Sequence, residues 1–238
     1  MRFSRFLIKR ILFLATILFT AACSKQPIFN QDYTRITVAP GPEDIALDTL
    51  KRNQRLIVSC SERRTIDYSK NGFYQYDILS ENVSPLTIVG LPPEIQLRPH
   101  GIDIAEVDGK TILYCVNHEK NAEEFPPAGR QSILVFELFE EKVIFVKQLT
   151  DSLLVSPNDV CADGRGGVFV SIDSGKINSK WEKLMALKRS YVVHYDGKNW
   201  KQVGDKLRYA NGVGVYDNRL FVTGTQEKTV TRYLFKED

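Results

Sequence analysis

Four short segments of the sequence place a polar side chain at the same point of a recurring pattern. Each begins with a small residue or proline, continues with the polar residue and with Asp or Gly, and then enters an alternating apolar run. The polar positions are Glu43, His100, Asn158 and Asn211, separated by 57, 58 and 53 residues. If one structural unit repeats with this spacing, the four side chains converge on one place.

The types of these residues suggest a metal site. Carboxylate and amide oxygens suit a hard cation such as calcium, whereas zinc would favour His and Cys. Asp44 and Asp159 follow two of the four positions. His100 could act as a base, and His118, eighteen residues later, could orient it or relay a proton. The alternative is that these are ordinary loop residues, since Asn and Asp are common in turns. Four such residues at the same position of a repeat favour a functional site over ordinary loops.

Strand-like runs must position these residues. Each motif is followed by a turn and then by the apolar runs RLIVSC, TILYCV, GVFVSI and RLFVTG, with a further strand in each unit. A fourth run, LTIVGL, KVIFVKQL or WKQVG, is present in three units. The pattern predicts an all-β fold, a β-propeller with about four blades, because inner loops of a propeller converge on its axis. A β-sandwich is the alternative, but it gives no reason for a repeated polar loop.

One segment interrupts the strands. Residues 177–190, INSKWEKLMALKRS, have apolar residues at helical spacing and predict an inserted amphipathic helix. Two interpretations stay open. The helix packs over the top of the propeller, or it forms a lid or a membrane-facing surface helped by its basic residues.

The motifs resemble the paraoxonase/arylesterase family of calcium-dependent, six-bladed β-propellers, which is akin to the gluconolactonase and strictosidine-synthase-like propellers. The resemblance covers residues 36–238. The segments that carry it are Pro42-Glu43-Asp44, Pro99-His100-Gly101-Ile102, Val116-Asn117-His118, Asn158-Asp159-Val160 and Ala210-Asn211-Gly212-Val213.

The resemblance implies a role for each matched residue. Glu43, Asn158 and Asn211 match ligands of a catalytic calcium. Asp44, Asp159 and the backbone carbonyl of Ile102 match ligands of a structural calcium. His100 and His118 match a histidine dyad, which Asp173 supports. The implied activity is hydrolysis of small esters or lactones, with calcium as a Lewis acid and His100 activating water.

The sequence departs from the family at its C-terminal end. The family's catalytic calcium also takes an adjacent Asp–Asn pair from the following blade, and this sequence stops 27 residues after Asn211. Asp217-Asn218 lies in a turn of the same unit and cannot replace that pair. We therefore expect about four of six blades and an incomplete calcium site. Three hypotheses stay open: an inactive piece of a longer hydrolase, a short variant that binds calcium or a ligand without catalysis, and a lipid-anchored scaffold for a protein partner.

The N-terminus has the pattern of an export signal. Arg2, Arg5, Lys9 and Arg10 precede a twelve-residue apolar run that ends before Cys23. Small residues before this Cys resemble a bacterial lipobox, and Ser24 resembles the outer-membrane sorting pattern. We expect a lipoprotein signal over 1–22, a tether over 23–35 and the propeller over 36–238, in a bacterial envelope and facing the periplasm. A soluble secreted protein and an uncleaved anchor are the alternatives.

The charge of the chain and its cysteines limit the kinds of binding partner and cofactor that the sequence indicates. Without residues 1–22 the chain has 28 Lys and Arg against 29 Asp and Glu, so no basic surface indicates nucleic-acid binding. Cys60, Cys115 and Cys161 form no metal or redox motif. One disulfide is possible in the periplasm, but buried free thiols are favoured. The sequence indicates neither the substrate nor the oligomeric state.

Overall fold

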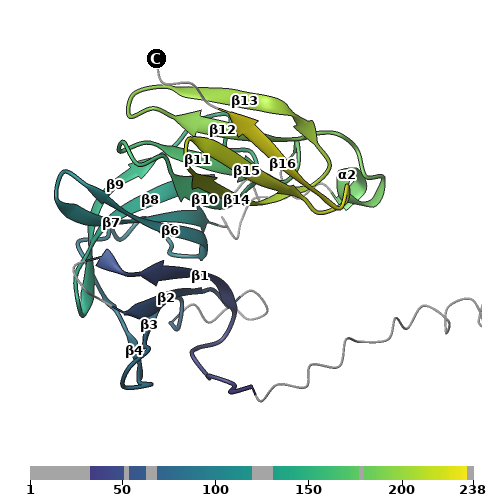
Figure 1. Ribbon diagram of the computed structural model, residues 1–238. Helices are drawn as coiled ribbons and strands as arrows, with labels where there is room; N and C mark the ends of the chain where they lie inside the picture. The colour runs from purple at the N-terminus through teal and green to yellow at the C-terminus, as the bar shows by residue number, and fades with distance from the viewer. Residues whose placement is uncertain (1–32, 51–53, 63–68, 120–130, 177–179, 235–238) are drawn as a thin grey trace, which may run out of the picture. The chain divides into compact units, whose positions relative to one another are not determined.

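The computed structural model describes residues 33–50, 54–62, 69–119, 131–176 and 180–234. All its elements lie in one compact unit, Thr37–Asp238 (Figure 1). The described strands form four sheets, antiparallel except for the pairing of one edge strand in the second, so the predicted β-propeller blades are confirmed.

The strands of each blade follow one another along the chain. The first blade holds β1 (Pro42–Asp48), β2 (Arg55–Cys60), β3 (Gly72–Asp77) and β4 (Val83–Pro85). The second holds β6 (Pro99–Val107), β7 (Lys110–His118), β8 (Gln131–Leu138) and β9 (Lys142–Leu149). The third holds β10 (Pro157–Ala162), β11 (Val168–Ile172), β12 (Ser190–Tyr195) and β13 (Trp200–Leu207), and the fourth holds β14 (Ala210–Tyr216), β15 (Arg219–Gly224) and β16 (Thr229–Leu234).

The run LTIVGL differs from its predicted place in the first blade. Its strand β5 (Thr87–Val89) pairs in parallel with β9 and becomes the outermost strand of the second sheet. The fourth strand of the first blade is instead the short β4. The chain therefore crosses from one blade to the next between Pro85 and Thr87, and this crossing joins the two sheets at their outer edges.

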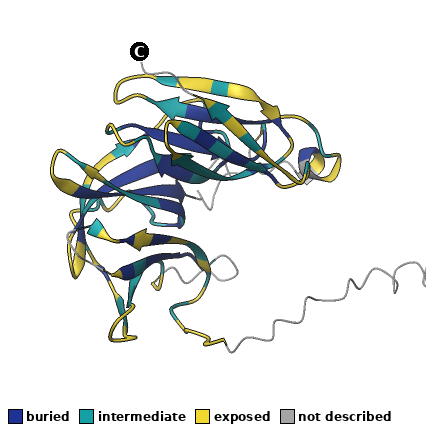
Figure 2. Ribbon diagram, in the orientation of Figure 1, coloured by how far each residue is buried: buried dark blue, intermediate teal, exposed yellow. Residues whose placement is uncertain are grey.

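The apolar core lies in the joints between blades. In β7, Leu113 and Cys115 pack toward the first blade, while Tyr114 and Val116 pack toward the third. Successive side chains of a strand point to opposite faces, so a strand covered on both faces must be apolar throughout. This explains the unbroken run TILYCV. Buried positions concentrate on the strands, and the connecting turns are exposed (Figure 2).

The predicted free thiols are confirmed. Cys60, Cys115 and Cys161 are buried and unpaired by disulfide. Burial raises the pKa of the Cys60 thiol to about 11, so the group stays protonated and behaves as a small apolar side chain.

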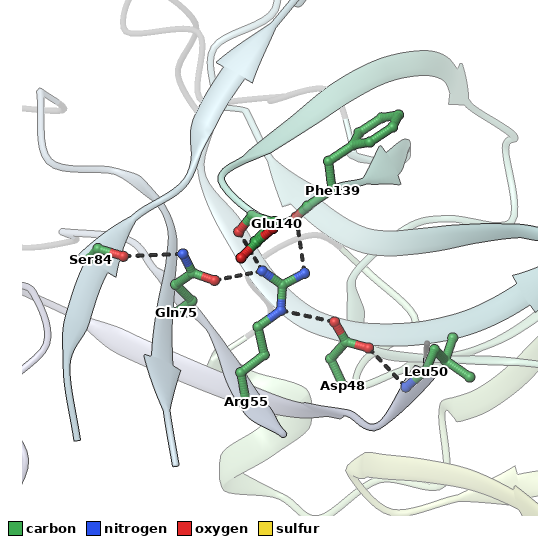
Figure 3. Close-up of polar contacts among 7 residues, drawn as sticks. All are labelled: Asp48, Leu50, Arg55, Gln75, Ser84, Phe139 and Glu140. Carbon is green, nitrogen blue, oxygen red and sulfur yellow. Dashed lines mark hydrogen bonds and ion pairs between the residues drawn. The ribbon is translucent and has the colours of Figure 1, made fainter. Parts of the chain in front are cut away.

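A buried arginine connects the first two blades (Figure 3). The Arg55 guanidinium donates to Asp48 at 2.9 Å and to the side chain of Gln75 within the first blade. It also donates to the carbonyls of Phe139 and Glu140, which lie in the turn between β8 and β9. Arg55 and Asp48 are almost wholly buried, so their ion pair compensates charges that burial would otherwise penalise.

The inserted helix is shorter than predicted. Helix α2 covers only Lys180–Leu184, while residues 177–179 lie outside the described part of the chain. Trp181, Leu184 and Met185 are exposed, at 65%, 77% and 51% of their full areas. The interpretation that this apolar face packs over the propeller is therefore wrong in this structure. A single turn of helix has too few hydrogen bonds to be stable without tertiary contacts.

Candidate active and metal-binding site

The four motif residues occupy the same position in each blade. Glu43, His100, Asn158 and Asn211 are the second residues of β1, β6, β10 and β14, the first strands of the four blades. Each first strand also has a register irregularity at this point, after Pro42, Pro99, Pro157 or Ala210. A bulge adds a residue and turns its side chain out of the pleat. The repeated bulge was not predicted from the sequence, although the repeated small residue or proline marks it.

A second position also repeats around the blades. The backbone N–H groups of Ser61, His118, Asp173 and Thr225 donate to the carbonyls of Gly41, Arg98, Ser156 and Tyr209, each of which precedes a motif or begins the turn into it. His118 and Asp173 are therefore equivalent residues of neighbouring blades, just beyond or at the end of the second strand. The sequence did not indicate this equivalence, because the two residues are of different types. It follows from the fold.

The two predicted histidines meet across this region. Their ring centroids are 5.1 Å apart and the planes are tilted by 53°. His100 Nδ1 lies 3.0 Å from the carboxylate of Glu43, and both side chains are about 15% exposed. Since that carboxylate accepts from Nδ1, Nε2 is the acceptor nitrogen of a neutral His100 ring.

Gln131, which the sequence analysis did not select, holds the second histidine. Its Oε1 lies 2.5 Å from His118 Nδ1. Residues His118 and Gln131 are cross-strand partners in β7 and β8, so the pairing of the sheet sets this contact. In this orientation of the amide, Nδ1 of His118 carries the proton. Only the register of β8 against β7 could have indicated Gln131.

Asp173 is buried at 7% exposure and accepts hydrogen bonds from two serines of its own blade. The hydroxyls of Ser156 and Ser174 donate to its Oδ1 at 2.6 and 2.9 Å. The hydroxyl of Ser190 also donates to its backbone carbonyl. Asp173 is thus firmly held at the position equivalent to His118, and its predicted support of the dyad stays a prediction.

In two of the four motifs, an aspartate forms a hydrogen bond to the next blade. Asp44 accepts a hydrogen bond from the N–H of Ile102 at 2.8 Å, and Asp159 accepts one from the N–H of Val213 at 2.9 Å. The predicted structural-calcium residues Asp44 and Ile102 are thus in direct contact. Gly101 lies so close to Asp159 that a Cβ there would be 2.7 Å from the Asp159 carboxylate oxygen. The structure brings Asp44, Ile102 and Asp159 together around this glycine.

Buried serines repeat the same link beside the aspartates. Ser59 accepts from the N–H of Asp44 and donates to the carbonyl of His100. In the third blade, Ser171 accepts from the N–H of Asp159 and donates to the carbonyl of Asn211. These serine bridges hold the backbone of one motif against the preceding blade.

The electrostatics of the aspartates indicate a place for a cation. Burial, joined by the nearby charges of Asp44 and Asp103, raises the pKa of Asp159 to about 7 despite hydrogen bonds from Val213 and Val160. Burial also raises the pKa of Asp103. Clustered, buried carboxylates repel one another, and a bound cation would relieve that repulsion.

The donor set fits calcium better than a transition metal. In the described residues, no three His, Cys, Asp or Glu side chains form a metal-holding group. The predicted sets instead combine carboxylates with the amides of Asn158 and Asn211 or the carbonyl of Ile102. Within the described part of the chain, those two amides have no hydrogen-bond partner. Such all-oxygen sets are typical of calcium.

Comparisons with known proteins agree with this geometry. The chain is 30% identical to mouse serum paraoxonase/arylesterase 1 over 140 residues, which cover 56% of this chain and 37% of that protein. It is 29% identical to the rat protein over 162 residues, covering 64% and 43%, and 27% identical to human serum paraoxonase/lactonase 3 over 131 residues, covering 52% and 35%. The chain thus spans about two fifths of the length of these relatives.

A solved structure supports the fold alone. The GH43_1 enzyme from Xanthomonas citri, complexed with xylotriose, aligns with a TM-score of 0.50 and 16% identity, over 79% of this chain and 67% of that one. A family model named Arylesterase matches residues 62–237, most of the chain, including His100, His118, Asn158 and Asn211. The chain therefore belongs to the paraoxonase/arylesterase family.

Proposed function

We propose that this protein is a calcium-dependent hydrolase of small carboxylic esters or lactones. The observation that carries the proposal is the contact of Glu43 and His100, at bulged strand starts, with each other and with His118 at the end of β7. Asn158 and Asn211 lie at the equivalent bulged starts of the next two blades. A histidine with an acceptor nitrogen can serve as the general base, and oxygen ligands beside it can hold a cation. Together these groups can promote the attack of water on a carbonyl.

Calcium held by Glu43, Asn158 and Asn211 would supply Lewis-acid stabilisation of negative charge on the carbonyl oxygen. His100 accepts the proton of the attacking water at Nε2, because Glu43 holds its Nδ1–H. Glu43 also stabilises the imidazolium that forms. His118, fixed through Nδ1 by Gln131, sits beside His100 and orients it or passes the proton on.

The structural-calcium set has a different task. Asp44, Asp159 and the carbonyl of Ile102 would hold a cation between the first three blades, where buried carboxylate charge needs compensation. A cation there would stabilise the packing of the blades rather than act on the substrate.

Hydrolysis assays test the enzyme proposal. We expect purified protein to hydrolyse phenyl acetate or a δ-lactone with calcium and to lose that activity on chelation. No turnover by the wild type would instead support the hypothesis that this chain is inactive because the family's Asp–Asn pair of calcium ligands is missing. His100→Gln should lower kcat/KM by about 100-fold or more, the scale of general-base catalysis. Asn199→Ala, at an exposed turn outside the site, is the matched control for Asn158→Ala and Asn211→Ala.

Thermal unfolding separates the outcomes. Calcium should raise the unfolding temperature, and the two Asn→Ala variants should reduce that rise. A higher unfolding temperature in calcium, without hydrolysis of the ester or lactone, would instead support the second candidate. That candidate is a lipid-anchored protein that binds calcium, a ligand or a partner without catalysis. If calcium changed neither stability nor activity, the metal assignment would be wrong.

We propose further that the chain is attached to the outer membrane of a bacterium through a lipid on Cys23, facing the periplasm. The basic N-terminus, the apolar run and the small residues before Cys23 support this; the structure does not describe this segment. In the part that it does describe, no helix is long and apolar enough to span a membrane. Radioactive palmitate should label the wild type, and retention of label by Cys23→Ala would contradict the proposal.

A further inference from the structure

A pocket of about 480 Å³ lies between the third and fourth blades, away from the motif residues. It is lined by side chains of β11, β12, β13, β15 and β16 and of the turn after β10. Figure 1 shows where these strands lie in the third and fourth blades. Asn158 is the second residue of β10 and Asp163 follows the end of that strand, so roughly 16 Å of extended strand separates the pocket from the candidate site. Its volume is in the range of small-molecule sites.

The floor of the pocket is apolar and aromatic. Phe169 and Leu220 are buried, at 3% and 2% exposure, and Val203 adds a further apolar wall. The His194 ring stacks on Phe169 with centroids 4.2 Å apart, and Asp163 fixes it through a 2.9 Å contact to Nε2. The Tyr233 ring completes the wall. A rigid surface of this kind suits a flat apolar body.

The acceptors in the lining already have partners. Asp163 accepts from the backbone N–H groups of Arg165 and Gly167 as well as contacting His194. Asp196 accepts from the N–H groups of Lys198 and Asn199. Neither carboxylate therefore needs a donor from a ligand.

Two cations line the pocket. Lys201 is exposed there, and within the described chain its ammonium interacts with Asp196 only at a distance and forms no ion pair. Arg165 is the second cation. The Tyr233 hydroxyl is buried from solvent, so a ligand in the pocket contacts the tyrosine ring instead. The two cations, beside carboxylates that already have donors, favour a ligand with an anionic group.

We propose that this pocket binds a small organic carboxylate with an apolar, aromatic body. The ring of the ligand lies against Phe169, Leu220 and Tyr233. Its carboxylate accepts from the ammonium of Lys201, at the exposed side of the pocket. The inference does not depend on the ester-hydrolase proposal, since no residue is shared between the two sites.

Binding of 2-naphthoate, measured by calorimetry on the purified protein, tests the proposal. We expect one site per chain. Lys201→Glu should weaken binding about tenfold, because it replaces a partly exposed attraction with a repulsion. Lys206→Glu, on the same strand but outside the pocket, is the matched control and should bind as the wild type does.

Two further arms distinguish this pocket from the candidate ester site. The uncharged 2-naphthamide should bind more weakly than the acid. His100→Gln should leave 2-naphthoate affinity unchanged, whereas a loss would place the ligand in the candidate ester site and overturn the proposal. Absence of binding to the wild type, or equal weakening by Lys201→Glu and Lys206→Glu, would also overturn it. Unchanged unfolding temperatures of the variants exclude misfolding as the cause.

Discussion

At the scale of single residues, the candidate site depends on a few contacts that fix proton positions. Glu43 and Gln131 each contact Nδ1 of one histidine, so both rings are held in a defined orientation. The sequence identified Glu43, as a calcium ligand, and both histidines. It could not identify Gln131, because a glutamine at the start of a strand has many ordinary uses.

We predict that Gln131→Ala lowers kcat/KM for phenyl acetate by about tenfold, since His118 loses its orienting partner while both histidines remain. The imidazole ¹⁵N shifts of His118 should change with it, which a purely structural effect would not produce. Gln202→Ala, on the exposed face of β13, is the control. If Gln131→Ala and Gln202→Ala were equally active, Gln131 would not position His118 for catalysis.

Asp163 makes stability depend on acidity. Burial alone would raise the pKa of this carboxyl, but the contact with His194 and the N–H groups of Arg165 and Gly167 lower it below its ordinary 3.8. Its stabilisation is therefore present above about pH 3.8 and is lost as the pH falls through the lower folded-state pKa. We predict that Asp163→Asn has a smaller drop in unfolding free energy below pH 4 than the wild type, as urea titrations would measure. Parallel pH curves would contradict this.

At the scale of elements, the bulged first strands and the serine bridges decide how neighbouring blades meet. Ser59 and Ser171 are fully buried, and each connects an N–H of its own blade with a carbonyl of the next. Because the two bridges share no partner, their contributions to stability are independent.

We predict that Ser59→Ala and Ser171→Ala each lower the free energy of unfolding by about 1–2 kcal/mol, since each leaves buried backbone groups unpaired. The double variant should show the sum of the two losses, measured by urea unfolding. Ser152→Ala, at an exposed turn, serves as the control. A change no larger than that of the control would show that the bridges do not stabilise the joints.

The exposed apolar side chains of α2 keep the membrane or lid interpretation open. Replacing Trp181, Leu184 and Met185 together by Ser should change stability by less than about 0.5 kcal/mol, because none of them is buried. The same variant should bind phospholipid vesicles less than the wild type in co-sedimentation. Unchanged sedimentation would exclude a membrane role for this helix.

At the scale of the molecule, a buried charge network around Arg55 joins the first two blades in addition to apolar packing and the polar links described above. Arg55 reaches from β2 to the turn of the second blade, where Phe139 and Glu140 offer their carbonyls. The sequence gives no sign of this connection, because its partners lie more than eighty residues away.

We predict that Arg55→Ala destabilises the protein by about 3 kcal/mol or more, because it removes a buried ion pair with Asp48 and the hydrogen bonds to the second blade. Arg219→Ala removes a salt bridge to Asp217 in which both side chains are substantially exposed, and it should change stability little. Guanidinium unfolding of both variants gives the comparison. A similar small effect for both would mean that Arg55 is not needed to join the blades.

The repeat, the all-β class and the positions of Glu43, His100, Asn158 and Asn211 follow from the amino-acid sequence alone. Strand periodicity and turn residues are local properties, and a motif that recurs in register reports on every blade at once. The equivalence of His118 and Asp173, the role of Gln131, the β5 crossing and the pocket between the last two blades emerge only from the folded chain. These depend on bulges, strand register and packing between sheets, which arise only when distant parts of the chain meet.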